Sequence, residues 1–113
     1  MKSNRFFIIH FILLCTLLFT SCEANKHITV TVFDAATNQP VDSVKIKVNA
    51  GTNGDYNKSY TEGFTDENGK FETYLMIGCA FGCYDIYIEY QKNGYIVKKD
   101  LNITEGNILL TPN

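Results

Sequence analysis

The stretch that decides the fold is residues 84–101, which read YDIYIEYQKNGYIVKKDL. In its first half, apolar residues at every second position alternate with Asp85, Tyr87 and Glu89. A strand points alternate side chains to opposite faces, so this pattern indicates a strand that is buried on one face. Asn93-Gly94 is typical of a tight hairpin turn. We therefore expect two antiparallel strands joined at residues 93–94.

Similar β-patterned runs, separated by turn-forming residues, continue on both sides of this hairpin. Together they predict an all-β fold, a single seven-stranded antiparallel β-sandwich. We expect the turn at Asp66-Glu67-Asn68-Gly69 to form a second hairpin. The polar, glycine-rich residues 50–58 are expected to be the longest loop, where binding could occur. The seven runs are residues 28–32, 44–48, 59–65, 71–75, 84–90, 95–101 and 108–111.

The first 21 residues have the order of a signal peptide. Lys2 and Arg5 precede an apolar run from residue 6 to residue 19, and the small residues Thr20 and Ser21 follow it. A run of 14 residues is shorter than the roughly 20 that span a bilayer. We expect a signal peptide over residues 1–21, a short tether over 22–26 and the sandwich domain over 27–113.

Leu18-Phe19-Thr20-Ser21-Cys22 resembles the lipobox of bacterial lipoproteins, although Phe19 departs from the usual leucine. The resemblance implies cleavage before Cys22 and acylation of that cysteine with diacylglycerol and palmitate, which would anchor the chain to membrane lipid. It implies a cell-envelope location, with the outer membrane favoured and either periplasmic or surface exposure. The alternative is an ordinary secretory signal.

The part of the chain after the leader resembles the carboxypeptidase regulatory-like family. The markers are Pro40-Val41 after a turn and the pattern Thr-Asp-x-Asn-Gly-x-Phe over residues 65–71. The resemblance covers nearly all of this part and implies a transthyretin-like, or prealbumin-like, sandwich. Such a module is usually an accessory to another domain. The matching segments are residues 28–34, 37–41, 44–48, 65–71, 84–88 and 94–95.

Charge and composition argue against nucleic-acid binding and catalysis. Two of the ten basic residues lie in the leader and all twelve acidic residues lie beyond it, which leaves 8 basic against 12 acidic residues and a net charge of −4. A negatively charged domain is unsuited to nucleic acid. With His27 as the only histidine after the leader, we expect no enzyme activity, no catalytic residue, no cofactor and no metal site.

Two cysteines remain after the leader and the lipidated position are set aside. Cys79 and Cys83 in an exported protein favour a disulfide over a metal site, which would need more ligands. Their three-residue separation also differs from the two-residue separation of thioredoxin-type redox motifs.

The sequence offers two candidate carbohydrate sites. Tyr56, Tyr60, Tyr74 and Tyr87 could form an aromatic platform for a glycan, although tyrosine also commonly covers outer sheet faces. Asp42-Ser43-Val44 resembles a short bacterial acceptor pattern for O-glycosylation at Ser43.

These observations favour a membrane-anchored lipoprotein that acts as a non-catalytic structural or interaction module of the envelope, with an envelope protein as partner. The alternatives are a glycan-binding accessory lipoprotein and an outer-membrane lipoprotein of a secretion apparatus.

Overall fold

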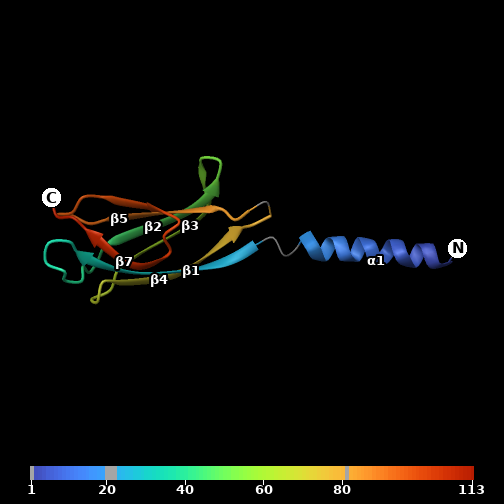
Figure 1. Cartoon of the computed structure of the whole chain (residues 1–113), viewed down its shortest axis with the longest axis horizontal. Helices are drawn as coiled ribbons and strands as arrows, with labels where there is room; N and C mark the ends of the chain where they lie inside the picture. The colour runs from blue at the N-terminus through green and yellow to red at the C-terminus, as the bar shows by residue number, and fades with distance from the viewer. Residues whose placement is uncertain (1, 20–22, 81) are drawn as a thin grey trace.

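A computed structural model describes residues 2–19, 23–80 and 82–113 of the chain (Figure 1). One helix precedes seven strands. The elements are α1 (Lys2–Phe19), β1 (Glu23–Asp34), β2 (Lys45–Thr52), β3 (Asp55–Phe64), β4 (Lys70–Gly78), β5 (Asp85–Gln91), β6 (Lys98–Leu101) and β7 (Glu105–Leu110).

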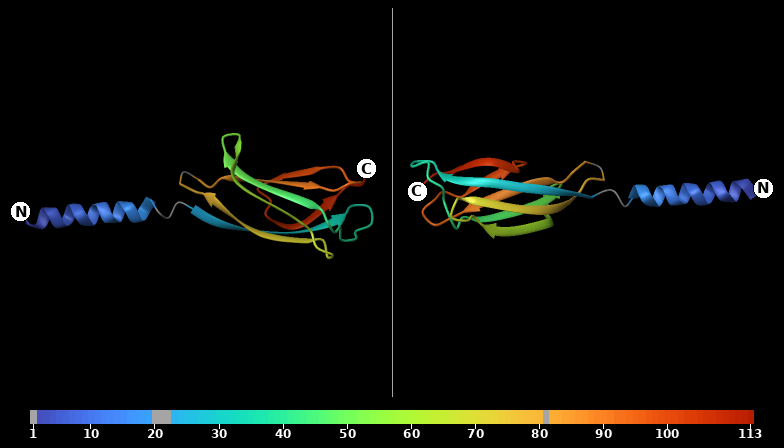
Figure 2. Two further views of the ribbon diagram at one scale, coloured as in Figure 1. Left: turned by 180° about the vertical axis from the view of Figure 1, so that it is seen from behind. Right: turned by 90° about the horizontal axis from the view of Figure 1, so that it is seen from below.

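The strands form two sheets that pack face to face, and the predicted all-β sandwich of seven strands is confirmed (Figure 2). One sheet has the order β4-β1-β7 and the other β3-β2-β5-β6. The sandwich is not entirely antiparallel, because β7 pairs with β1 in parallel, from Thr29 opposite Glu105 to Asp34 opposite Leu110. The first and last strands are therefore neighbours that run in the same direction.

The core lies between the sheets and is built from the alternating apolar positions of the sequence. Val30, Val48, Ile88 and Tyr90 are among the side chains that are almost completely buried. Each large apolar side chain buried in this way contributes roughly 1.5–3 kcal/mol. Tyr84, which begins the deciding stretch, packs against this core while remaining half-buried.

The two ends of the sandwich carry different connections. The entry end holds the start of β1, the β2–β3 turn and the β4–β5 connection, because Glu23 pairs with Gly78 and Gly51 pairs with Asp85. The far end holds the β1–β2, β3–β4 and β5–β6 connections and the C-terminus (Figure 1).

The expected hairpin of residues 84–101 forms between β5 and β6, but its turn is wider than the sequence predicts. Tyr90 pairs with Lys98, so residues 92–97 connect the strands. The two residues that follow Asn93-Gly94 bond to the C-terminal segment instead of to β5. Tyr95 forms a bridge with Pro112, and the Ile96 N–H donates to the Thr111 carbonyl.

The predicted long loop at residues 50–58 is wrong, because most of that segment is strand. β2 continues to Thr52 and β3 begins at Asp55, with a bulge between Ala50 and Thr52. Asn53 and Gly54 form the turn, and both have positive φ, as a type I′ hairpin requires. The Asn-Gly pair therefore predicts the conformation of this segment better than its polar composition does.

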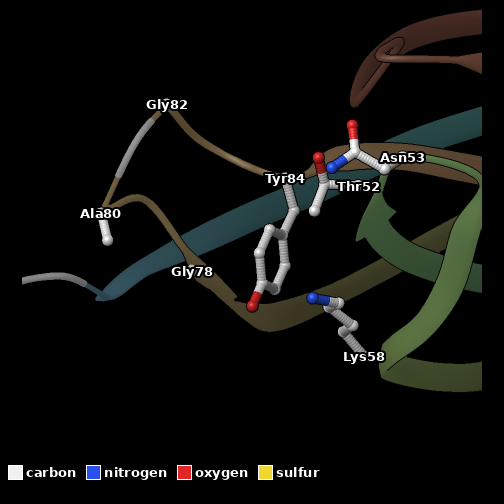
Figure 3. Close-up of a pocket in the computed structure, with 7 residues that line it drawn as sticks. All are labelled: Thr52, Asn53, Lys58, Gly78, Ala80, Gly82 and Tyr84. Carbon is white, nitrogen blue, oxygen red and sulfur yellow. The ribbon is translucent and has the colours of Figure 1, made fainter.

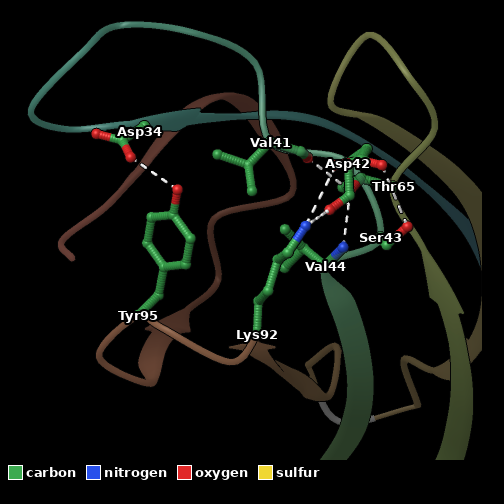
Figure 4. Close-up of polar contacts among 8 residues, drawn as sticks. All are labelled: Asp34, Val41, Asp42, Ser43, Val44, Thr65, Lys92 and Tyr95. Carbon is green, nitrogen blue, oxygen red and sulfur yellow. Dashed lines mark hydrogen bonds and ion pairs between the residues drawn. The ribbon is translucent and has the colours of Figure 1, made fainter. Parts of the chain in front are cut away.

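The predicted hairpin at Asp66–Gly69 is also wrong, since the strands that it joins belong to different sheets. The reason is Thr65, a buried residue whose hydroxyl donates to the Val41 carbonyl at 2.7 Å and accepts from the Val44 N–H at 2.9 Å (Figure 4). These bonds hold the chain at the edge of one sheet as it crosses to the other.

Two polar contacts close the far end beside Thr65 (Figure 4). The Tyr95 hydroxyl donates to the Asp34 carboxylate at 2.7 Å, and the Lys92 ammonium lies 3.2 Å from the Asp42 carboxylate. The first contact lowers the pKa of Asp34 and the second lowers the pKa of Asp42.

The predicted tether of residues 22–26 needs correction. β1 begins at Glu23, and residues 23–26 pair with residues 75–78 of β4, so these four residues are part of the sandwich. Three of the four side chains are polar, so hydrophobic periodicity does not predict a strand here. Cys22 itself lies outside the described residues.

Helix α1 extends away from the entry end (Figure 1). Its described apolar side chains are exposed, and Phe7 keeps 80% of its surface accessible. Within the described ranges, no helix is long and apolar enough to cross a membrane.

Candidate functional site

The entry end brings together the segments that the sequence marks for attachment and for disulfide formation. Cys22 is bonded to Glu23, the first paired residue of β1, and Glu23 lies opposite Gly78 at the end of β4. Cys79 follows Gly78 directly. Glu23, the residue that follows the position predicted for lipidation, therefore lies beside the start of the β4–β5 connection.

The Cys79–Cys83 disulfide is formed, as the sequence predicts. Beyond it, the Tyr84 N–H donates to the Gly78 carbonyl at 2.9 Å, so the chain closes on itself at the base of the connection. A side chain on Gly78 would meet the Tyr84 ring at 2.7 Å, which explains the glycine. Phe81, between the two cysteines, lies outside the described residues.

A cleft of about 430 Å³ separates this connection from the β2–β3 turn (Figure 3). Lys58 of β3 and Tyr84 point into it, and the Lys58 ammonium lies 5.5 Å from the centre of the Tyr84 ring. Its described lining is completed by Thr52, Asn53, Gly78, Ala80 and Gly82.

Lys58 is the one charged side chain among the described residues that line the cleft. The neighbouring acidic residues, Asp55 and Asp85, keep their charge, but their carboxylates accept hydrogen bonds from residues outside the described lining. The Asp55 carboxylate accepts from the Asn57 N–H at 3.1 Å, and the Asp85 carboxylate accepts from the Asn102 amide at 3.1 Å. The cleft therefore presents a positive charge beside neutral hydroxyl and amide groups.

Sequence reasoning missed this cleft. Composition predicts a binding loop at residues 50–58, and the alternation of residues 84–90 places Tyr84 only on the buried face of a strand. The signal that could have revealed the cleft is a third Asn-Gly pair, at residues 53–54, which predicts a hairpin that brings Lys58 close to Thr52.

Three of the four tyrosines of the predicted platform lie on the outer face of the four-stranded sheet. Strand register aligns Tyr60, Asn49, Tyr87 and Leu101 in one row across β3, β2, β5 and β6. Tyr56 joins this row, since its ring centre lies 5.5 Å from that of Tyr87. We call Tyr56, Tyr60, Asn49 and Tyr87 the tyrosine row.

Tyr74 does not belong to the tyrosine row. It lies on the outer face of the other sheet, where its ring stacks on His27 at 4.6 Å. Strand pairing alone separates it from the other three tyrosines, which hydrophobic periodicity could not reveal.

A charged row follows the tyrosine row along the sheet. Glu62, Lys47, Glu89 and Lys99 lie opposite one another in strand order, with alternating sign. The Tyr60 hydroxyl donates to the Glu62 carboxylate, which raises the pKa of Tyr60 and lowers the pKa of Glu62. Because the signs alternate, this face has little net charge.

Ser43, the residue predicted to accept a glycan, is exposed at the far end with a positive φ of 55°. Its hydroxyl lies 3.5 Å from the Asp42 carboxylate, and its N–H donates to the Thr65 carbonyl at 3.0 Å. The side chain is accessible, and O-glycosylation there stays a prediction.

No group of three or more His, Cys, Asp or Glu side chains in the described part of the chain could hold a metal ion. His27 has Glu72 at 3.5 Å and the Tyr74 ring as its neighbours, both on the outer sheet face.

Comparison with known proteins supports the fold. No protein-family model matches the chain, and no curated protein matches it. Among solved structures, the fold is similar to the C-terminal domain of the shaft pilin spaA from Lactobacillus rhamnosus GG, with a TM-score of 0.54 and 15% identity. The match covers 80% of this chain and 99% of the pilin domain. The fold thus defines the class of the chain, which is a β-sandwich domain.

Proposed function

We propose that the chain is a lipoprotein, lipidated at Cys22, whose β-sandwich serves as a non-catalytic structural or interaction module of the cell envelope. The observation that carries the proposal is the exposure of the apolar side chains of α1. The described apolar side chains of this helix, from Phe6 to Leu14, are exposed and add nothing to the core, which suits a leader that an export machinery recognises. Residues 1–21 would be removed, and the mature chain would begin at Cys22.

The start of β1 supports an anchored arrangement. With Glu23 already paired, Cys22 would be attached to the sandwich with no flexible residue between them. The module would then be held against the membrane surface. We propose that this membrane is the outer membrane. Likeness to a pilin domain is compatible with a structural role, and membership of the carboxypeptidase regulatory-like family remains part of this proposal.

Intact mass of the protein purified from its native membrane tests this proposal. We expect a chain that begins at Cys22, with the added mass of its acyl chains, and a Cys22→Ala variant that lacks this mass. An unlipidated native chain would contradict the anchor. Reduction should add two hydrogen masses if the Cys79–Cys83 bond forms in the cell, which is an independent readout.

The tyrosine row favours glycan as a second candidate partner. Tyr60 and Tyr87 flank Asn49 from the two neighbouring strands, so their backbones lie about 10 Å apart. Aromatic rings stack on the apolar faces of sugars, and an amide between them can bond to hydroxyl groups. A linear glycan could therefore lie across the strands.

Affinity electrophoresis in polysaccharide gels tests the glycan candidate. We expect retardation of the native protein, loss of retardation in a Tyr60→Ala/Tyr87→Ala variant, and no loss in Tyr74→Ala, which removes an exposed tyrosine from the other sheet. Equal mobility of all three proteins in every polysaccharide would rule this candidate out.

A further inference from the structure

We propose that the entry-end cleft lined by Thr52, Asn53, Lys58 and Tyr84 binds the phosphate group of a phosphate ester. The ester is either the head group of a membrane lipid or a soluble molecule, since the two share the chemistry that the cleft recognises. The arguments from charge and from the lining groups do not require lipidation of Cys22, whereas the argument from position rests on the proposed function.

The first argument is charge. Lys58 is exposed, and within the described structure its ammonium has the Tyr84 ring, and no carboxylate, as its neighbour. A neutral ring leaves the ammonium charge uncompensated, whereas Lys45 and Lys92 both lie beside carboxylates. A lysine ammonium is a common ligand for phosphate because it offers three donors and a full positive charge.

The second argument is the set of neutral groups around that charge. Thr52 and Tyr84 bring hydroxyl groups to the cleft and Asn53 brings an amide, all of which can donate to phosphate oxygens (Figure 3). Among its described residues the lining contains no acidic side chain that would repel an anion. A volume of about 430 Å³ can hold a head-group-sized ester.

The third argument is position. Gly78 lines the cleft and pairs with Glu23, the residue that follows Cys22. A chain anchored at Cys22 would hold the cleft beside the lipid head groups, where phosphate is abundant. Ala80 and Gly82, which also line the cleft, are exposed.

Nuclear magnetic resonance of the full ¹⁵N-labelled chain tests the proposal. One arm titrates glycerol 3-phosphate into protein held in a non-ionic detergent, with glycerol as the neutral control. The other arm transfers the protein to bilayer discs of phosphatidylglycerol, with a non-ionic surfactant film as the phosphate-free reference. The amide signals of Thr52, Asn53, Lys58 and Tyr84 are followed in both.

We expect saturable shifts of these signals in at least one arm. Lys58→Gln should weaken the response about tenfold or more, because it removes a charge-assisted bond. Lys58→Arg should retain it, and Lys70→Gln, which removes a charge at the far end of β4, should leave it unchanged. A response to glycerol 3-phosphate with none in discs identifies a soluble ester, a response in discs alone identifies a head group, and a response in both supports a site open to either source. Shifts that are absent in both arms, or equally strong in Lys58→Gln, overturn the proposal.

Discussion

Thr65 illustrates how single residues determine this fold. Its one hydroxyl bonds to both Val41 and Val44, so it joins the end of β3 to the segment that enters β2. Asp66 acts in a similar way, because its carboxylate accepts from the N–H groups of Asn68 and Lys70, both at 2.9 Å. The residues that resemble a family marker thus have structural tasks that require no ligand.

Tyr90 is the residue at which a substitution should stabilise the protein. Its side chain is fully buried, and its hydroxyl has no hydrogen-bond partner among the described residues. Burial raises the pKa of Tyr90, with a further contribution from the charge of Asp100. Tyr90→Phe should raise the free energy of unfolding by about 1 kcal/mol, because an unpaired buried hydroxyl costs roughly 1–3 kcal/mol. Chemical denaturation measures this, and a loss of stability would show that the hydroxyl is bonded.

The Asp34–Tyr95 bond should make stability depend on pH. The bond lowers the pKa of Asp34 from its ordinary 3.8, so its stabilising effect is complete above that value and is lost as pH falls through the lower pKa of the folded state. It raises the pKa of Tyr95, so the effect is also lost as pH rises above the ordinary 10.

Tyr95→Phe should therefore be less stable than the native protein near neutral pH, with a smaller loss of stability below pH 3.8. Asp42 and Glu62, whose pKa values are also lowered, keep part of the acid dependence in both proteins. Thermal melts across the pH range provide the measurement. Parallel curves for the two proteins would contradict a contribution from this bond.

At the scale of elements, alternation of apolar residues predicts most strand centres. It does not predict where strands end or which strands pair. The centres of β1, β2, β4 and β5 follow the period of two because one face of each is buried. The mostly polar end at Glu23–Lys26 becomes strand because each of its residues pairs with β4, although only Ala24 among them packs against the core. Such pairing leaves no mark in hydrophobic periodicity.

Two turn glycines allow a matched test of what positive φ and close packing each contribute to stability. Gly69 and Gly54 both have positive φ, but a Cβ on Gly69 would lie 2.5 Å from the Val32 carbonyl oxygen, whereas one on Gly54 would meet nothing within 4 Å. Gly54→Ala should cost about 1 kcal/mol for its conformation alone. Gly69→Ala should cost clearly more, about 2–4 kcal/mol, because the turn must also move. Equal losses in denaturation experiments would contradict the close approach.

At the scale of the whole molecule, the sequence predicts the sandwich and the Cys79–Cys83 bond but not the assembly of the sites. The four tyrosines divide between two sheets, and the entry-end cleft needs the β2–β3 turn beside the β4–β5 connection. The division of the tyrosines and the formation of the cleft both depend on which strands become neighbours. That choice is made by contacts between residues far apart in the chain, such as Asn49 with Tyr87.

The parallel pairing of β1 with β7 determines how the molecule would respond to mechanical force. Tension between Glu23, at the entry end, and the C-terminus, at the far end, pulls the two strands along their length in opposite directions. Their six residue pairs are then loaded together in shear. Tension between Glu23 and Gly78 instead opens the β1–β4 ladder one pair at a time.

Single-molecule pulling should therefore give a higher rupture force with handles at residues 23 and 113 than with handles at residues 23 and 78. A chain tethered at its N-terminus and loaded from its C-terminus would be held in its strong direction, so this β-sandwich has the geometry of a tension-bearing link.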